Sequence, residues 1–247
     1  MQANHIIRDA VERVTQLRQL AAGNPLLAAA IGEVKHFQAA RFAATYADFL
    51  STEKYKTVAL FFLEELYSAK DYTQRDAQFA RIASALERLF PEQVVKTAVS
   101  LAQLHCLTEE LDLAMAQQWM NDPDTPQVAR YVTAWRGVAR RPERNLQLAT
   151  VMNVGNELDH LTRIPGLRRL LKMMRGPASL AGLGSLQRFL ESGFDTFASM
   201  GADGDCDGAR HFLNTVQLRE AGLIERLFAI DRVACEAEIS TTLCTSR

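Results

Sequence analysis

The chain of 247 residues carries 28 Lys and Arg against 29 Asp and Glu, and 48% of its residues are hydrophobic. This composition is typical of a globular protein and excludes a disordered or fibrous chain. The longest stretch without charge, residues 19–32, is shorter than the roughly 20 apolar residues of a membrane-spanning helix, so we expect no membrane association. Four scattered cysteines favour free thiols and the reducing cytoplasm.

Apolar residues recur at steps of three and four along most of the chain, which is the period of an amphipathic helix. In chain order, the clearest stripes begin at Ile31, Tyr55, Phe79, Val94, Tyr131, Val151, Leu167, Leu186 and Phe212. No stretch alternates as a strand would, and Ala and Leu, which favour helices, far outnumber Val and Ile. We therefore predict an all-α protein of about nine or ten helices and no sheet, arranged as a multi-helix, bundle-like domain.

Most of the prolines stand where a helix can begin, since the first helical N–H has no partner inside the helix. These are Pro25, Pro91, Pro126, Pro142, Pro165 and Pro177. We predict a single domain over residues 1–230, with a sub-boundary near the polar residues 121–126. The apolar pattern weakens beyond Asp231, so we expect residues 231–247 to form a frayed tail.

Two blocks of sequence stand out. The first is Phe61-Phe-Leu-Glu-Glu-Leu-Tyr67, followed by Asp71 and by Arg75-Asp76; the second comprises Pro177-Ala178 and Phe189-Leu-Glu-Ser-Gly-Phe194. Together they resemble a proteobacterial, all-helical protein family of unknown function that carries an FF-x-x-x-LY…D…RD block. The resemblance extends over most of the chain, and it implies no activity.

Arg75 shares a helical face with apolar residues, and a buried arginine needs a partner because an unpaired charge is costly to bury. Glu65 or Asp71 could supply that partner. The pair would either fix a helix hairpin or, with Tyr67, line a small-ligand pocket. His105 also lies on an apolar stripe, where it is either a hydrogen-bonded core residue or a further member of that pocket.

Two Glu-x-x-His pairs, Glu33 with His36 and Glu157 with His160, have the spacing of a di-iron helical bundle, but both face away from their apolar stripes. Residues 203–208 match the first half of a calcium loop, yet Asn214 stands where the bidentate Glu belongs. We therefore expect no metal and no cofactor.

Charge is unevenly distributed. Residues 130–188 carry 11 Lys and Arg against 3 Asp and Glu, whereas residues 1–129 carry 12 against 16 and residues 189–247 carry 5 against 10. We expect the basic segment to form a binding surface over residues 140–175. The candidate binding residues are Arg140, Arg141, Arg144, Arg168, Lys172 and Arg175.

Two interpretations of this segment remain open. It is either a surface for an acidic protein partner or a helix face neutralised by the acidic flanks. Scarce aromatic residues disfavour nucleic acid. The leading hypothesis is a non-enzymatic binding or regulatory protein, and the alternative is a helical enzyme or small-ligand-binding protein with the pocket around Tyr67, Asp71, Arg75 and His105. The sequence leaves enzymatic activity undecided and a homo-oligomer open.

Overall fold

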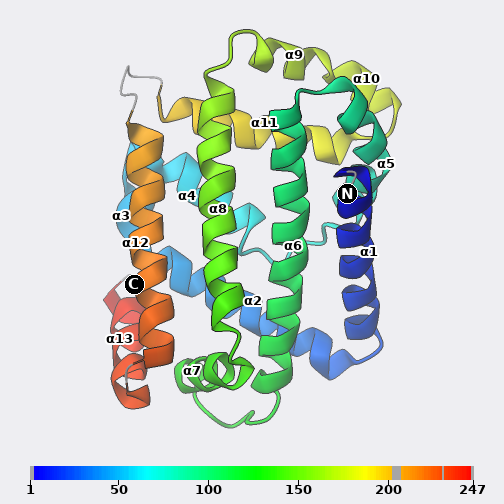
Figure 1. Ribbon diagram of the computed structural model, residues 1–247. Coiled ribbons are helices and arrows are strands. Elements are labelled where there is room, and N and C mark those ends of the chain that lie inside the picture. Colours follow the sequence, from blue (N-terminus) through cyan, green and yellow to red (C-terminus); the bar gives the residue numbers. More distant parts are fainter. Residues whose placement is uncertain (1–2, 202–206, 230, 246–247) are drawn as a thin grey trace. The chain divides into compact units, whose positions relative to one another are not determined.

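The computed structural model describes residues 3–201, 207–229 and 231–245. Within them it contains thirteen α-helices and no strand, which confirms the all-α fold class (Figure 1). The helices are α1 (Ala3–Ala22), α2 (Pro25–Thr45), α3 (Ala47–Ser51), α4 (Glu53–Glu65), α5 (Thr73–Leu89), α6 (Glu92–Trp119), α7 (Gln127–Val138), α8 (Arg141–Thr162), α9 (Leu167–Met173), α10 (Arg175–Leu180), α11 (Gly184–Ser199), α12 (Gly208–Ala229) and α13 (Arg232–Thr245).

The described helices outnumber the nine or ten expected because one predicted stripe is divided between two helices and because α1, α10 and α13 lie where no stripe was predicted. The stripe that runs from Ile31 to Phe49 is interrupted at Tyr46, whose φ of −114° and ψ of 27° end α2 and begin α3. Helix starts follow the prolines more closely. Pro25 occupies the first turn of α2, and the Asn24 side chain accepts a hydrogen bond from the backbone N–H of Leu27 at 3.3 Å.

Contacts divide the chain into two compact units, each assembled from three stretches of sequence. Unit 1 comprises Met1–Thr15, Asp71–Cys106 and Thr150–Leu213, and unit 2 comprises Gln16–Lys70, Leu107–Ala149 and Asn214–Arg247. Four long helices, α1, α6, α8 and α12, contribute residues to both units. The expected sub-boundary near residues 121–126 falls inside unit 2.

Unit 2 contains a large aromatic core. Phe37, Trp119, Tyr131 and Trp135 pack together with aliphatic side chains from α2, α6, α7, α12 and α13. The C-terminal stretch differs from the frayed tail that we expected, because α13 packs against α2 and α7 and buries part of its length. Its core contacts come from Cys235, Ile239 and Leu243. These residues form a stripe only one residue wide, which is too narrow to stand out in the sequence as an amphipathic helix.

Unit 1 is packed more closely around small side chains. Ala10, Ala83, Ala98 and Ala102 are buried with Ile7 and Leu86 between α1, α5 and α6. A Cβ atom on Gly155 of α8 would lie 2.5 Å from the Leu213 side chain, so a larger residue there would force the Leu213 side chain to shift. Helix α11 packs against α5, α9 and α10, and α9 and α10 form a connected pair at the top of Figure 1.

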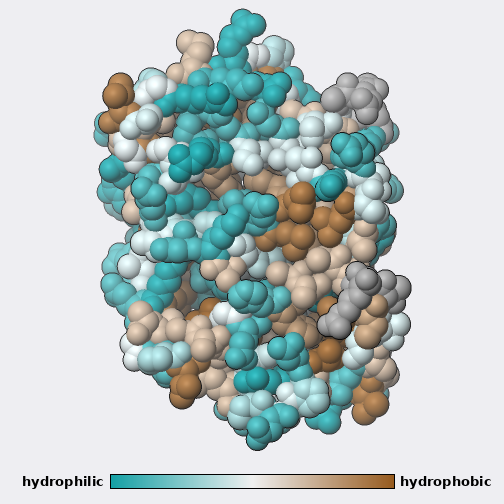
Figure 2. Space-filling view, turned by 180° about the vertical axis from the view of Figure 1, so that it is seen from behind, coloured by the Kyte–Doolittle hydropathy of each residue, from teal (hydrophilic) through white to brown (hydrophobic). Residues whose placement is uncertain are grey.

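The surface carries both hydrophilic and hydrophobic residues. Figure 2 shows a face that is mostly hydrophilic, with hydrophobic residues gathered in separate patches. Among the described residues, no helix combines the length and the apolar composition needed to cross a membrane.

Candidate functional site

Unit 2 encloses a set of charged and phenolic side chains that we call the buried polar cluster. They project from α2, α6, α7, α8 and α12 and from the segments that follow α2 and α4. The members are Lys35, Gln38, Arg41, Tyr46, Tyr67, Glu109, Asp112, Tyr131, Arg144 and Glu220.

An ion pair between Arg41 and Glu220 joins α2 to α12 at the centre of the cluster. Arg41 Nη1 donates to Glu220 Oε1 at 2.5 Å, and the Tyr46 hydroxyl donates to the same oxygen at 3.0 Å. Burial by itself lowers the pKa of Arg41, but Glu220, Tyr67 and Tyr131 together outweigh burial and raise the pKa well above its ordinary value. The pKa of Tyr46 is also raised, first by burial and then by the Glu220 charge, so its hydroxyl stays a donor.

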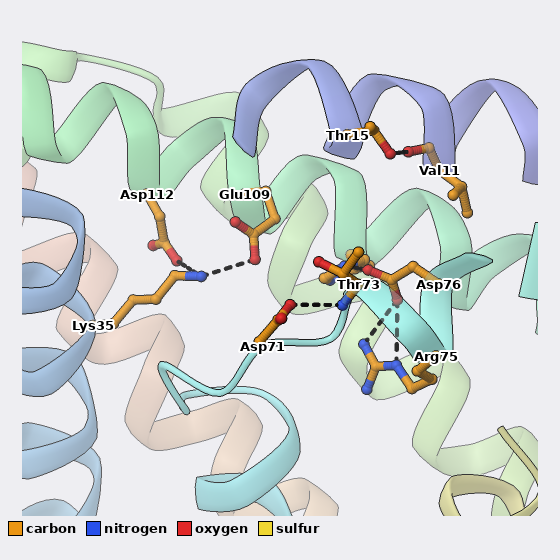
Figure 3. A network of polar contacts seen from close by, with 10 residues as sticks. Val11, Thr15, Lys35, Asp71, Thr73, Arg75, Asp76, Glu109 and Asp112 are labelled. Carbon is orange, nitrogen blue, oxygen red and sulfur yellow. Dashed lines mark hydrogen bonds and ion pairs between the residues drawn. The ribbon is translucent and has the colours of Figure 1, made fainter. Parts of the chain in front are cut away.

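Lys35 forms a second charged group with two acids of α6 (Figure 3). Its Nζ lies 2.8 Å from Glu109 Oε1 and 3.8 Å from Asp112 Oδ2. Burial lowers the pKa of Lys35, and the two carboxylates raise it above its ordinary value. Burial raises the pKa of Asp112, because the longer contact with Lys35 does not compensate for lost hydration.

Arg144 is the third cation of the cluster, and its surroundings differ from those of the other two. Its guanidinium carbon lies 4.0 Å from the centre of the Trp135 ring, and its Nη1 donates to Gln147 Oε1 at 3.2 Å. Among the described residues, no carboxylate lies within ion-pair distance of Arg144. Burial lowers its pKa. Arg144 is only 5% exposed, so its expected place on a basic surface is corrected.

The other two arginines of that stretch are more exposed and already have acidic partners. Arg140 Nε lies 3.0 Å from Glu143 Oε1, and Arg141 Nη2 lies 2.5 Å from Glu225 Oε2. Residues 140–144 belong to unit 2, whereas the remaining candidates of the basic segment belong to unit 1.

The residues of the expected pocket are also divided between the units. Glu65 and Tyr67 belong to unit 2, and Asp71, Arg75 and His105 belong to unit 1. Tyr67 joins the buried polar cluster, where the guanidinium carbon of Arg41 lies 5.6 Å from its ring centre. Burial raises the pKa of Tyr67, and Glu220 adds to the effect.

In unit 1, Asp76 contacts both Arg75 and His105, and Figure 3 shows the contact with Arg75. Its carboxylate accepts from Arg75 Nε at 3.3 Å and lies 2.9 Å from His105 Nε2. Arg75 is mostly buried, as expected. Its Nε contacts the carboxylate of its neighbour Asp76; the expected pairing with Glu65 or Asp71 stays a prediction. Asp71 accepts from the backbone N–H of Thr73 at 2.9 Å, beside the start of α5.

Aromatic rings explain how Arg75 reaches a residue beside it on the same helix. Its guanidinium carbon lies 4.0 Å from the centre of the Tyr72 ring and 4.8 Å from that of Phe189. Stacking between these rings favours a guanidinium folded back along the helix. Helical spacing alone does not predict this pairing, because residues i and i+1 point in different directions.

The most exposed candidate lies on α9, which contains no buried residue. Gly166, Arg168, Arg169, Lys172 and Met173 line an open hollow of about 630 Å³ that we call the α9 surface. Arg168 Nε donates to Asp195 Oδ1 at 2.7 Å. Among the described residues, no acidic group lies within ion-pair distance of Arg169 or Lys172.

Apolar side chains accompany these charges. Leu170, Met173 and Leu180 are exposed. Leu170 is exposed although it follows Leu167 on a predicted apolar stripe, because α9 rests on α10 and α11 through only part of its surface. The result is a cationic surface with uncovered apolar side chains.

The metal candidates do not assemble. Within the residues that the structure describes, no group of three His, Cys, Asp or Glu side chains could hold a metal ion. Glu33 accepts from Trp119 Nε1 at 2.7 Å, and His36 Nδ1 lies 2.7 Å from the Gly32 carbonyl oxygen of its own helix. Asp203 and Asp205 of the half calcium loop lie outside the described residues.

One family model matches most of the chain. A family described as "Domain of unknown function (DUF8198)" matches residues 17–233. The chain belongs to the DUF8198 family. Membership of a family of unknown function is thereby confirmed, and the DUF8198 region contains both the buried polar cluster and the α9 surface. No curated protein and no solved structure matches the chain.

Proposed function

We propose that this protein is a non-enzymatic binding or regulatory protein that docks an acidic segment of a partner protein on the α9 surface. The observation that carries the proposal is the hollow of about 630 Å³, which places Arg168, Arg169 and Lys172 beside the exposed side chain of Met173. A partner helix with carboxylates on one side and leucines on the other complements both features.

Charge explains why the partner is acidic. Arg168 and Arg175 already contact Asp195 and Glu191, so a partner's carboxylates would be attracted first to Arg169 and Lys172. Such exposed charges increase the rate of association more than they increase the affinity. Burial of Leu170, Met173 and Leu180 would supply the larger part of the affinity.

The same residues favour a protein over other anions. No aromatic side chain lines the hollow, so bases of single-stranded nucleic acid have nothing on which to stack. Helix α9 has only 7 residues and α10 only 6, and a helix that lies on a membrane usually presents a longer apolar face. We also propose a cytoplasmic location, which the free cysteines support. The resemblance to the family with the FF-x-x-x-LY…D…RD block supports a bacterial origin.

The experiment is a double charge reversal, Arg169→Glu with Lys172→Glu, tested for binding to a labelled synthetic helix of Glu and Leu. We expect the unaltered protein to bind this peptide at low salt and to lose it as salt rises. The reversed protein should fail to bind. A matched control, Lys96→Glu with Arg210→Glu, changes the net charge equally at two other exposed positions of unit 1 and should bind normally.

Two outcomes contradict the proposal. Equal loss in both double variants would show that only net charge matters. Preference for anionic lipid vesicles or DNA over the peptide would assign the α9 surface to a different partner.

A second candidate is a helical enzyme or small-ligand-binding protein, and the contact between Asp76 and His105 favours it. A carboxylate that orients an imidazole is an arrangement used by general bases. This candidate becomes the better description if a small molecule, and not the peptide, shifts the NMR signals of the His105 ring.

A further inference from the structure

Unsatisfied hydrogen-bond donors gather in unit 2. Among the described residues, the buried side-chain nitrogens that lack a partner are Arg41 Nε, Trp135 Nε1 and Arg144 Nη2. All three belong to unit 2, and all three are donors. Folded proteins satisfy nearly all of their buried donors, so a group of three requires an explanation.

Two of these donors belong to side chains that are in contact. The Arg144 guanidinium covers the Trp135 ring at 4.0 Å, so its Nη2 and the indole Nε1 belong to stacked groups. The two helices that carry them are joined by a very short turn. Ala139, at the end of α7, has a φ of 52°, a left-handed conformation that is strained for alanine. This turn allows α8 to begin at Arg141 and returns Arg144 to Trp135.

The third donor belongs to the same electrostatic environment. The charges of Arg41 and Arg144 both lower the pKa of Tyr131, although burial raises it overall. Tyr131 therefore lies within the field of both guanidinium groups.

Among the described residues, Arg144 also lacks a counter-charge within ion-pair distance. Glu220 is engaged with Arg41, and Glu109 and Asp112 are shared by Lys35. Asp112 is the acid whose field reaches Arg144, but its carboxylate contacts Lys35 and does not lie within ion-pair distance of the Arg144 guanidinium. A buried guanidinium without a paired anion is costly, and a water molecule would satisfy its N–H groups but not its charge.

We propose that unit 2 binds a small oxyanion, such as a carboxylate or phosphate group, against Arg144 and Trp135. One oxygen would accept from Arg144 Nη2 and another from Trp135 Nε1, since a planar guanidinium presents donors in the fork that oxyanions match. Arg41 Nε would add positive potential from the α2 side. The proposal concerns unit 2 alone, so it does not depend on the α9 surface.

The two tryptophans of the chain provide a direct test by NMR of the indole N–H groups. Trp119 Nε1 already donates to Glu33 and serves as the internal reference. We expect inorganic phosphate or acetate, added separately at constant ionic strength, to shift the Trp135 signal to saturation and to leave the Trp119 signal in place. The Trp135→Phe variant assigns the two signals.

Arg144→Lys keeps the positive charge but removes the fork of donors, so the apparent affinity should fall by about tenfold or more. Arg141→Lys is the matched control, because Arg141 lies on the same helix with an exposed acidic partner, and its affinity should not change. If Arg144→Lys does not fold, the titration of the unaltered protein decides alone. A Trp135 signal that neither anion moves would show that water alone satisfies these donors and would overturn the proposal, as would equal shifts of both indoles.

Discussion

The buried polar cluster of unit 2 and the α9 surface of unit 1 contain ion pairs of similar length in very different surroundings. Arg41 and Glu220 approach to 2.5 Å with side chains 5% and 11% exposed. Arg168 and Asp195 approach to 2.7 Å with side chains 56% and 40% exposed. Because the N–O distances are nearly equal, the two pairs differ mainly in their exposure to solvent.

Solvent decides what each pair contributes. Exposed pairs are weakened by water and salt and contribute about 0–1 kcal/mol. A buried ion pair stabilises the fold little more than a pair of apolar side chains would. Removal of one partner is nevertheless costly, because it leaves the other charge buried and unpaired. The cluster therefore fixes the interior of unit 2, while the charges of the α9 surface are available to a partner.

The largest effect is expected when the central buried pair is broken. Glu220→Gln preserves the side-chain shape but leaves Arg41 without a counter-charge. We expect the free energy of unfolding to fall by about 3–5 kcal/mol, measured by urea denaturation.

A matched control lies on the same helix. Glu225→Gln removes the acid from the exposed pair with Arg141 and should cost no more than about 1 kcal/mol. Equal costs for the two variants would mean that water reaches both pairs alike, and the contrast between the buried cluster and the surface would fail.

A smaller effect should appear as a change in pH dependence at Asp112. Because burial raises its pKa above the ordinary 3.8, the folded state keeps the proton to higher pH than the unfolded state. Stability from this group is therefore full below pH 3.8 and is lost as pH rises through the folded pKa. Asp112→Asn cannot ionise, so the stability of the unaltered protein relative to this variant should decline with rising pH. A rise instead would show that Lys35 stabilises the charge more than burial opposes it.

The sequence was sufficient for the fold class because apolar periods near 3.6 recur throughout. It was insufficient for helix α13, whose stripe includes a cysteine and is one residue wide. The division into units was not accessible either, since each unit combines stretches that are distant in the sequence. Contacts of this kind depend on tertiary packing and leave no local pattern.

The candidate sites were partly predictable from charged residues that lie on apolar helical stripes, but the sequence analysis applied this argument to Arg75 alone. We noticed Arg75 because it lies on an apolar stripe, but Arg41 follows Val34 and Phe37 on such a stripe in α2. Glu220 likewise lies between Val216 and Leu223 in α12. A search for all charges on apolar stripes finds both partners of the central pair. It does not pair them, because 179 positions separate them.

The smallest effect on stability is expected at the surface, where Asp195→Asn removes the acid that contacts Arg168. Both side chains are well hydrated, so the free energy of unfolding should change by no more than about 0.5 kcal/mol.

The same substitution should increase the affinity for the acidic peptide. With Asp195 neutral, Arg168 joins Arg169 and Lys172 as a cation without an acidic partner, and the acidic peptide should bind more tightly at low salt. The gain should vanish at high salt, because screening weakens exposed charges. Fluorescence anisotropy at two salt concentrations measures it, and unchanged affinity at low salt would show that the peptide does not contact the α9 surface.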